Sequence, residues 1–417
     1  MQELSARQGP INDAFWSPRL TVNATKAIFH QWQQLEATCC IDNFRIAAGE
    51  KDGFREGWFF ADSDAYKWLD AASRIYALPP NPELASIMDA LIALIERAQM
   101  DDGYIFTYNQ IHFPHQRWVN LQIEHELYCH GHLIEAGVSH YEATGRRDLL
   151  DICIKAADLL VRDFLNTSND KTCGHEEIEL ALIRLYRVTK NEDYLELARQ
   201  FVERRGRTLF YGLQWWLQNK SHQNRKAYVN QLRQDYIAKH PEYKFFRLPG
   251  DNYVKMPPFS RLRHRVNALR GFYAQYHTPI RKQTTPVGHS VRFGYLETAI
   301  AMLCREEQNL SPRRTQSTRR EKPKGFSFVT FVPFVFKKEP HKTLLSAMEQ
   351  AWERMVARRM YITGGLGAAP YIEGFGSDYE LDPEYAYNET CASLASLFWN
   401  WEMALLTQNA RYSDLFE

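Results

Sequence analysis

The sequence predicts an all-α fold, and three observations lead to this prediction. Apolar residues recur at three- and four-residue spacing over most of the first 205 residues, which is the period of an amphipathic helix. Short turn-forming stretches such as residues 78–82 (LPPNP) separate consecutive segments, as between the helices of a hairpin. Strand-like runs do not alternate with these segments, which argues against a βα fold. We therefore expect a series of helical hairpins.

Each expected helix follows from the same pattern. Residues 1–20 come first and are predicted to form an extended arm, because Pro18 biases the residue before it away from the helical region. The remainder, residues 21–417, is expected to form one large domain. Its helical pattern covers residues 22–40, 62–77, 83–100, 121–144, 147–164, 177–189 and 192–205.

Two later stretches are less regular. Residues 206–288 are rich in aromatic and basic side chains, and aromatic rings stack on the C–H faces of sugars, so they could form one wall of a glycan-binding cleft. Ordinary packing explains them equally well. Residues 305–342 contain ten Lys and Arg against four Glu, together with the run FSFVTFVPFVF. We expect this basic part to be disordered and to be an insertion or a mistranslated stretch, not a nucleic-acid patch.

Composition excludes several function classes. A net charge of +1 gives no reason to expect nucleic acid or an anionic membrane as a partner. No apolar run reaches the length of a membrane span, and the first residues lack the apolar core of a secretory signal, so a cytoplasmic location is predicted. Seven irregularly spaced cysteines do not form a disulfide framework. The neighbours Cys39 and Cys40 lie in a helical pattern and are predicted to be buried core thiols, not metal ligands.

The segment 361–400 concentrates glycines, carboxylates and a cysteine. Its glycines permit a loop of unusual backbone conformation, and its last part has the small, apolar composition of a helix. Glu389 and Cys391 fall where loop becomes helix. A carboxylate and a thiolate can share one zinc ion. The alternative is a first-turn carboxylate favoured by the helix dipole and a small core thiol.

Several blocks of the sequence, in order, resemble those of glycoside hydrolase family 127, the β-L-arabinofuranosidases. They are residues 60–69 (FADSDAYKWL), 102–104 (DGY), 126–136 (ELYCHGHLIEA), 173–182 (CGHEEIELAL), 276–279 (YHTP), 288–292 (GHSVR) and the segment 361–400. The resemblance implies an all-α (α/α)6 barrel as catalytic domain, with an atypical insertion at about 305–342. It also implies that the β-sandwich domains usual in the family are absent from these 417 residues.

The resemblance also implies roles for individual residues. Glu373 matches the acid/base of a retaining mechanism, and its apolar neighbours are expected to raise its pKa. The family's nucleophile is a zinc-bound cysteine thiolate, and its zinc is held by one Glu and three Cys. Glu389 and Cys391 match two of these ligands. No cysteine follows Cys391 in the sequence, so we expect substoichiometric zinc and no turnover from these 417 residues alone.

Three histidines match the family's substrate contacts: His132, His175 and His289. Each follows a glycine, which would leave room for a sugar hydroxyl, and a neutral imidazole both donates and accepts a hydrogen bond. The implied ligand is an arabinose-containing plant glycan. Two alternatives stay open. The chain could be a sugar epimerase or lyase on the same toroid, with histidines as acid and base, or an inactive remnant that only binds glycans.

Overall fold

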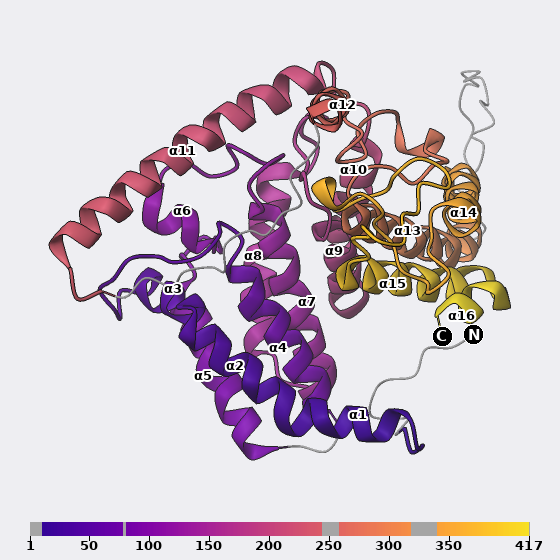
Figure 1. Cartoon of the computed structure of the whole chain (residues 1–417). Helices are drawn as coiled ribbons and strands as arrows, with labels where there is room; N and C mark the ends of the chain where they lie inside the picture. Colours follow the sequence, from indigo (N-terminus) through magenta and orange to yellow (C-terminus); the bar gives the residue numbers. More distant parts are fainter. Residues whose placement is uncertain (1–10, 78–80, 244–257, 318–339, 417) are drawn as a thin grey trace, which may run out of the picture. The chain divides into compact units, whose positions relative to one another are not determined.

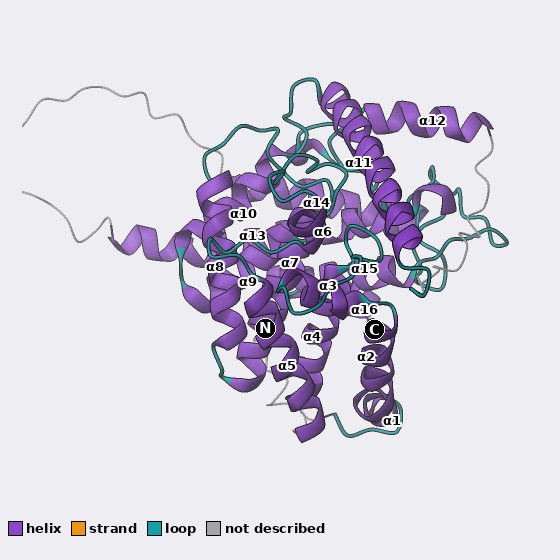
Figure 2. Ribbon diagram, turned by 90° about the vertical axis from the view of Figure 1, so that its left-hand side faces the viewer, coloured by secondary structure: helices purple, strands orange, loops and turns teal. Residues whose placement is uncertain are grey.

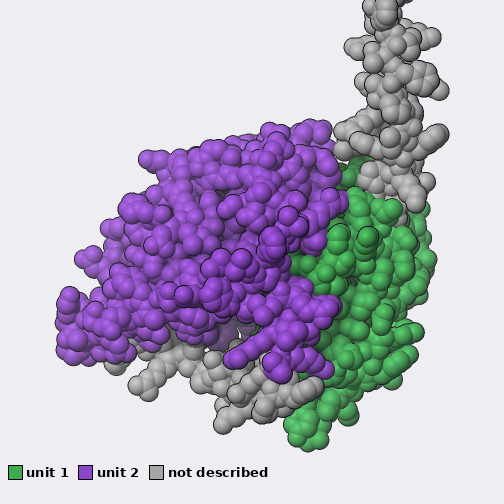
Figure 3. Space-filling view, turned by 90° about the horizontal axis from the view of Figure 1, so that it is seen from above, with its two compact units in different colours: residues 1, 275–417 green, residues 2–274 purple. Residues whose placement is uncertain are grey.

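The structure is a computed structural model that describes residues 11–77, 81–243, 258–317 and 340–416. The described residues are helices and loops without a β-strand, as Figure 2 shows, so the predicted all-α class is confirmed. The chain divides into two compact units, residues 2–274 and residues 1 and 275–417, coloured separately in Figure 3. None of the described helices is long and apolar enough to span a membrane.

The first unit contains twelve described α-helices and one π-helical turn, Asn23–Ala27. Their bounds are α1 Trp16–Val22, α2 Ile28–Ala37, α3 Cys40–Ala47, α4 Asp62–Tyr76, α5 Pro82–Ala98, α6 Thr107–His112, α7 Glu126–Thr144, α8 Asp148–Phe164, α9 Ile178–Thr189, α10 Glu192–Arg204, α11 Tyr211–Lys239 and α12 Pro258–Leu269. Each predicted helix of this unit is present, and the hairpins α4–α5, α7–α8 and α9–α10 pack as consecutive pairs (Figure 1).

Helix α7 is the centre of this unit and packs against α4, α8 and α9. It is buried on almost every side, which its mixture of small, apolar and histidine residues allows. Close packing against α8 requires Gly137, because a Cβ there would lie 2.2 Å from the Cys153 sulfur. The burial of α7 places its histidines inside the unit, away from bulk water.

Three local predictions for this unit are wrong. Helix α1 begins at Trp16, so residues 16–20 are not extended. Pro18 lies in the first turn, where a missing N–H breaks no helical hydrogen bond. Cys39 adopts a left-handed conformation that separates α2 from α3, and it is only partly buried, whereas the neighbouring Cys40 is a core thiol as predicted.

The third error is the 29-residue helix α11 within the stretch expected to be irregular. It lacks an apolar stripe, and two of its three buried side chains are polar. Its buried His222 and Arg225 lie 3.0 and 3.2 Å from the Glu124 carboxylate. Hydrophobic periodicity cannot detect a helix that is attached in this way.

The second unit is built on helices α13 Ser290–Ser317, α14 Pro340–Arg358, α15 Thr390–Thr407 and α16 Ala410–Phe416, with 3₁₀ turns at Ile280–Lys282 and Pro370–Ile372. Helix α13 packs against α14 and α15, and α15 against α16. The ring of Phe293 contacts Phe375 and Trp399 in the core. Helix α13 continues to Ser317, which contradicts disorder for residues 305–317. The prediction for residues 318–339 lies outside the described residues.

Candidate active site

The predicted acid/base lies in a loop of the second unit that folds back onto the start of α13. Glu373 has a left-handed backbone, with φ of 49°, and its carbonyl oxygen accepts hydrogen bonds from Ser290 N at 3.0 Å and Ser290 Oγ at 2.9 Å. Gly374 pairs with His289 in an isolated antiparallel bridge. A Cβ at Gly374 would lie 2.0 Å from the Gly288 carbonyl oxygen, so this approach requires glycine.

This backbone contact brings two predicted site residues together. His289 Nε2 lies 3.0 Å from Glu373 Oε2. The hydrogen bond from His289 is the largest influence on Glu373 and lowers its pKa, and it outweighs the opposing effect of burial. The predicted rise in the pKa of Glu373 is therefore wrong for this structure. Its apolar sequence neighbours do not set its environment, because a histidine 84 residues away along the chain does.

The predicted zinc ligands lie at the start of α15, as expected. Burial raises the pKa of Glu389, whereas a hydrogen bond from Cys391 opposes the rise. The negative charge of Glu373 raises the pKa of Glu389 further, so both carboxylates belong to one site. Glu389 Oε2 is buried and has no hydrogen-bond partner among the described residues, and the Cys391 thiol is exposed.

Such an orphaned oxygen beside a thiol fits two donors of a zinc ion. Two donors do not complete a tetrahedral shell. The part of the chain that the structure describes contains no group of three or more His, Cys, Asp or Glu side chains that could hold a metal. The two residues therefore fit zinc as part of a larger ligand set.

The loop that carries these residues is fixed at several points. Asn388 N donates to Gly367 O at 3.0 Å, and Glu389 N donates to Leu366 O at 3.2 Å. Farther along the loop, the Asp378 carboxylate lies against three arginines of the α14 region, at 2.8 Å from Arg354, 3.1 Å from Arg358 and 2.7 Å from Arg359. Hydrogen bonds from these arginines lower the pKa of Asp378. The sequence analysis did not identify this anchor, because its partners are distant in sequence.

The other two predicted histidines lie together in the first unit. The ring of Tyr128 is 4.4 Å from both His132 and His175, measured between centroids. His175 Nδ1 lies 2.9 Å from the Glu176 carbonyl oxygen, which places its proton on that nitrogen. Tyr128 was not predicted, although it precedes His132 by four residues on one face of a helix and could have been found by that spacing.

His132 makes a second contact that the sequence analysis missed. Its Nδ1 lies 3.1 Å from Glu177 Oε1. Burial lowers the pKa of His132 well below its ordinary value and raises that of Glu177, with the charge of Glu135 adding to the second effect. Burial therefore favours the neutral form of both groups. A neutral imidazole and a neutral carboxyl suit hydrogen bonding to uncharged sugar hydroxyls.

The glycines before His132 and His175 were predicted to leave room for a sugar hydroxyl, but the structure shows that they allow close packing within the protein. A Cβ at Gly131 would lie 2.6 Å from the Glu177 side chain, and one at Gly174 would lie 2.1 Å from the Gln122 carbonyl oxygen. The room that they leave is filled by the protein itself. Gly131 is thus needed for the approach of Glu177 to His132.

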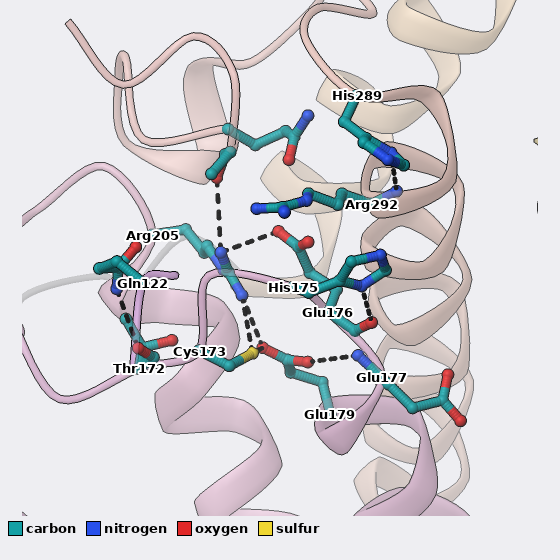
Figure 4. A network of polar contacts seen from close by, with 12 residues as sticks. Gln122, Thr172, Cys173, His175, Glu176, Glu177, Glu179, Arg205, His289 and Arg292 are labelled. Atoms are coloured by element: carbon teal, nitrogen blue, oxygen red, sulfur yellow. Dashed lines mark hydrogen bonds and ion pairs between the residues drawn. The ribbon is translucent and has the colours of Figure 1, made fainter. Parts of the chain in front are cut away.

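Figure 4 shows what holds the segment that carries His175 and Glu177. The buried Arg205 guanidinium pairs with Glu176 Oε1 at 2.8 Å and with Glu179 Oε1 at 3.0 Å. A second oxygen of Glu179 accepts from Glu177 N at 3.3 Å. One arginine therefore neutralises two carboxylates on either side of Glu177 and fixes the backbone between them.

Comparison with known proteins places the chain among the glycoside hydrolases. The family model described as "Beta-L-arabinofuranosidase, GH127 catalytic domain" matches residues 10–417. The chain belongs to glycoside hydrolase family 127. It is 30% identical to the non-reducing end β-L-arabinofuranosidase of Bifidobacterium longum subsp. longum, over 98% of this chain and 55% of that protein.

Solved structures agree with this placement. A GH127 β-L-arabinofuranosidase from Geobacillus stearothermophilus T6 is 34% identical, with a TM-score of 0.75, over 98% of this chain and 54% of that one. A second structure, a GH127 β-arabinofuranosidase, is 26% identical with a TM-score of 0.72, over 99% and 52%. These matches confirm the predicted (α/α)6-barrel fold class of the family. The chain spans about half the length of these relatives.

Proposed function

We propose that this chain carries the acid/base carboxylate of a retaining β-L-arabinofuranosidase-like hydrolase that acts on arabinose-containing glycans. The observation that supports the proposal most is the 3.0 Å contact between His289 and Glu373 in a segment with the family's sequence blocks. Relatives and solved structures named as arabinofuranosidases, similar over nearly the whole chain, support the sugar class.

In this proposal, Glu373 protonates the leaving glycosidic oxygen while a nucleophile approaches the opposite side of the anomeric carbon. The resulting carboxylate then takes a proton from the water that releases the sugar. A lowered pKa keeps Glu373 ionised for the second step. For the first step, His289 would exchange its hydrogen bond to Glu373 for one to a sugar hydroxyl, which removes the largest influence lowering that pKa. His132 and His175 would bind further hydroxyls.

Glu389 and Cys391 would hold zinc together with donors from outside the described residues. When bound, zinc lowers the pKa of a coordinating thiol and so supplies thiolate at neutral pH. The contribution of this chain is an orphaned carboxylate oxygen beside an exposed thiol. A cytoplasmic location also stays a proposal, which cell fractionation would test.

A panel of nitrophenyl glycosides tests the proposed activity on protein in which further donors complete the zinc site, because these 417 residues alone are expected to show no turnover. We expect cleavage of the β-L-arabinofuranoside, and loss of at least about a hundredfold in Glu373→Gln, the scale of general acid catalysis. Cleavage of other sugars with none of this one would contradict the proposal. Activity that survives both Glu389→Gln and Cys391→Ser but not His175→Ala would favour an epimerase or lyase. Binding of arabinose oligosaccharides without any turnover would indicate a glycan-binding remnant.

A further inference from the structure

The loop before α4 is built around one buried arginine. The Arg55 guanidinium, 2% exposed, donates from Nη1 to the carbonyl oxygens of Gly57 at 3.0 Å and Trp58 at 2.6 Å, and from Nη2 to that of Phe59 at 3.4 Å. It also pairs with the buried Asp62 at 3.5 Å. The backbone oxygens of this loop are thus directed inward to a fixed charge. A loop held in this way keeps its aromatic side chains in set positions.

This loop presents the Trp58 side chain to solvent. Trp58 is 38% exposed, although tryptophan is normally well buried. Its ring is parallel to that of Phe60, with 6.1 Å between centroids and 1° between planes. Lys226 of α11 places its ammonium 5.7 Å from the Trp58 ring. A fixed, exposed aromatic ring beside a hydrogen-bond donor is a suitable platform for a sugar.

A continuous row of rings joins this platform to the histidine cluster of the first unit. Phe60 lies 5.2 Å from His125, and His125 lies 5.0 Å from His175, centroid to centroid. His175 in turn lies 4.4 Å from Tyr128. Three such contacts, of 6.1, 5.2 and 5.0 Å between centroids, lead from Trp58 through Phe60 and His125 to His175. A glycan that follows this row from a terminal sugar at His175 would therefore bring a later ring, not the next one, to Trp58.

We propose that Trp58, with Phe60 and Lys226, forms a further sugar subsite that binds a later ring of the glycan. This inference rests on the proposed function, because it takes His132 and His175 as the contacts of the terminal arabinose. The C–H face of the later ring stacks on Trp58, and the Lys226 ammonium donates to one of its hydroxyls. Because Arg55 already fixes the loop, binding orders few new side chains.

Calorimetry on the purified protein tests the subsite without requiring turnover. The two ligands are methyl β-L-arabinofuranoside, which has a single ring, and a longer oligosaccharide that ends in β-L-arabinofuranose and extends along the row to Trp58. We expect Trp58→Ala to weaken oligosaccharide binding about tenfold, the scale of one lost aromatic contact. It should change binding of the methyl glycoside less than twofold. Trp58→Phe should retain most of the oligosaccharide affinity, and Lys226→Met should lose a few-fold.

The chain offers a matched control. Trp216 on α11 is 49% exposed and also has a lysine ammonium near its ring, that of Lys220 at 5.6 Å. Among the described residues it has no ring contact that leads to the histidines. Trp216→Ala should therefore bind both ligands like wild type, and Trp58→Ala should keep the wild-type melting temperature within about 2 °C.

The outcomes separate the two proposals. Equal effects of Trp58→Ala on both ligands, or no effect on either, would overturn the subsite while leaving the arabinofuranoside assignment intact. A loss in Trp216→Ala as large as in Trp58→Ala would also overturn it. Wild-type protein that binds neither ligand would overturn the proposed function and this inference with it.

Discussion

At the scale of single residues, the pairing of Glu373 with His289 determines how the site titrates. His289 donates to the carboxylate, so the charged form is favoured and its pKa is lowered. Glu373 and the histidines were identified as candidates from sequence blocks. Their pairing was not predicted, because the backbone bridge between Gly374 and His289 brings the two side chains together, and no local pattern joins these residues.

Removing the histidine should move the titration of Glu373. In His289→Ala the largest influence lowering that pKa is lost, so the pKa rises. A general acid must be protonated, and activity falls as pH rises through its pKa. The alkaline limb of the kcat/KM profile is therefore expected to move to higher pH. Carbon-13 NMR titration of the carboxyl measures the same shift directly.

His289→Gln is the control for this prediction, since an amide can still donate to Glu373 and should keep the pKa closer to its wild-type value. An unmoved carboxyl titration in His289→Ala, or one moved to lower pH, would show that the hydrogen bond does not govern Glu373.

The buried carboxyl of Glu297 makes the stability of the fold depend on pH. Glu297 on α13 is 2% exposed, its Oε2 has no hydrogen-bond partner among the described residues, and burial raises its pKa to about 8. Folded protein then keeps a proton that the unfolded chain loses near pH 4.5. The free energy of unfolding therefore falls as pH rises from about 4.5 to about 8.

Glu297→Gln mimics the protonated acid and should remove this loss. We expect unfolding free energy like wild type at pH 5 and about 1–3 kcal/mol higher than wild type at pH 8.5. Urea unfolding of both proteins at the two pH values measures this difference in unfolding free energy. Glu384→Gln, at an exposed carboxylate, should show no such difference. A Glu297→Gln variant no more stable than wild type at pH 8.5 would contradict the assignment.

At the scale of elements, the sequence predicts helices well where an apolar stripe faces a core. It fails for α11, whose contacts include those of the buried His222 and Arg225 with Glu124. It also fails at Cys39, where a single left-handed residue divides a continuous helical pattern. Both errors arise because tertiary contacts, not periodicity, determine the local structure.

The loop that carries Glu373 depends on its attachment to α14. Asp378→Asn removes the charge that faces Arg354, Arg358 and Arg359, and leaves three guanidinium groups close together. We expect about 1–2 kcal/mol of destabilisation. The loop should also exchange its amide hydrogens faster than wild type, by mass spectrometry of residues 361–389.

Glu384→Gln again serves as control, being an exposed carboxylate of the same loop. Unchanged amide exchange in Asp378→Asn would show that the backbone contacts to Leu366 and Gly367 suffice to hold the loop. The arginine cluster would then be only a surface feature.

At the scale of the whole molecule, family and fold class followed from ordered sequence blocks spread over most of the chain. The two compact units each hold part of the predicted set. His132 and His175 lie in the first, and Glu373, His289, Glu389 and Cys391 lie in the second. The division was not predicted, because contacts within each unit link residues that periodicity treats as one continuous series of hairpins.

Zinc content and release of L-arabinose from a β-L-arabinofuranoside, measured on the same preparations of protein in which further donors complete the zinc site, test the central claim most directly. We predict that turnover rises with bound zinc, that Cys391→Ser loses both, and that Glu373→Gln keeps zinc but loses turnover by at least about a hundredfold. Turnover from zinc-free protein, or turnover that survives Glu373→Gln, would contradict the account.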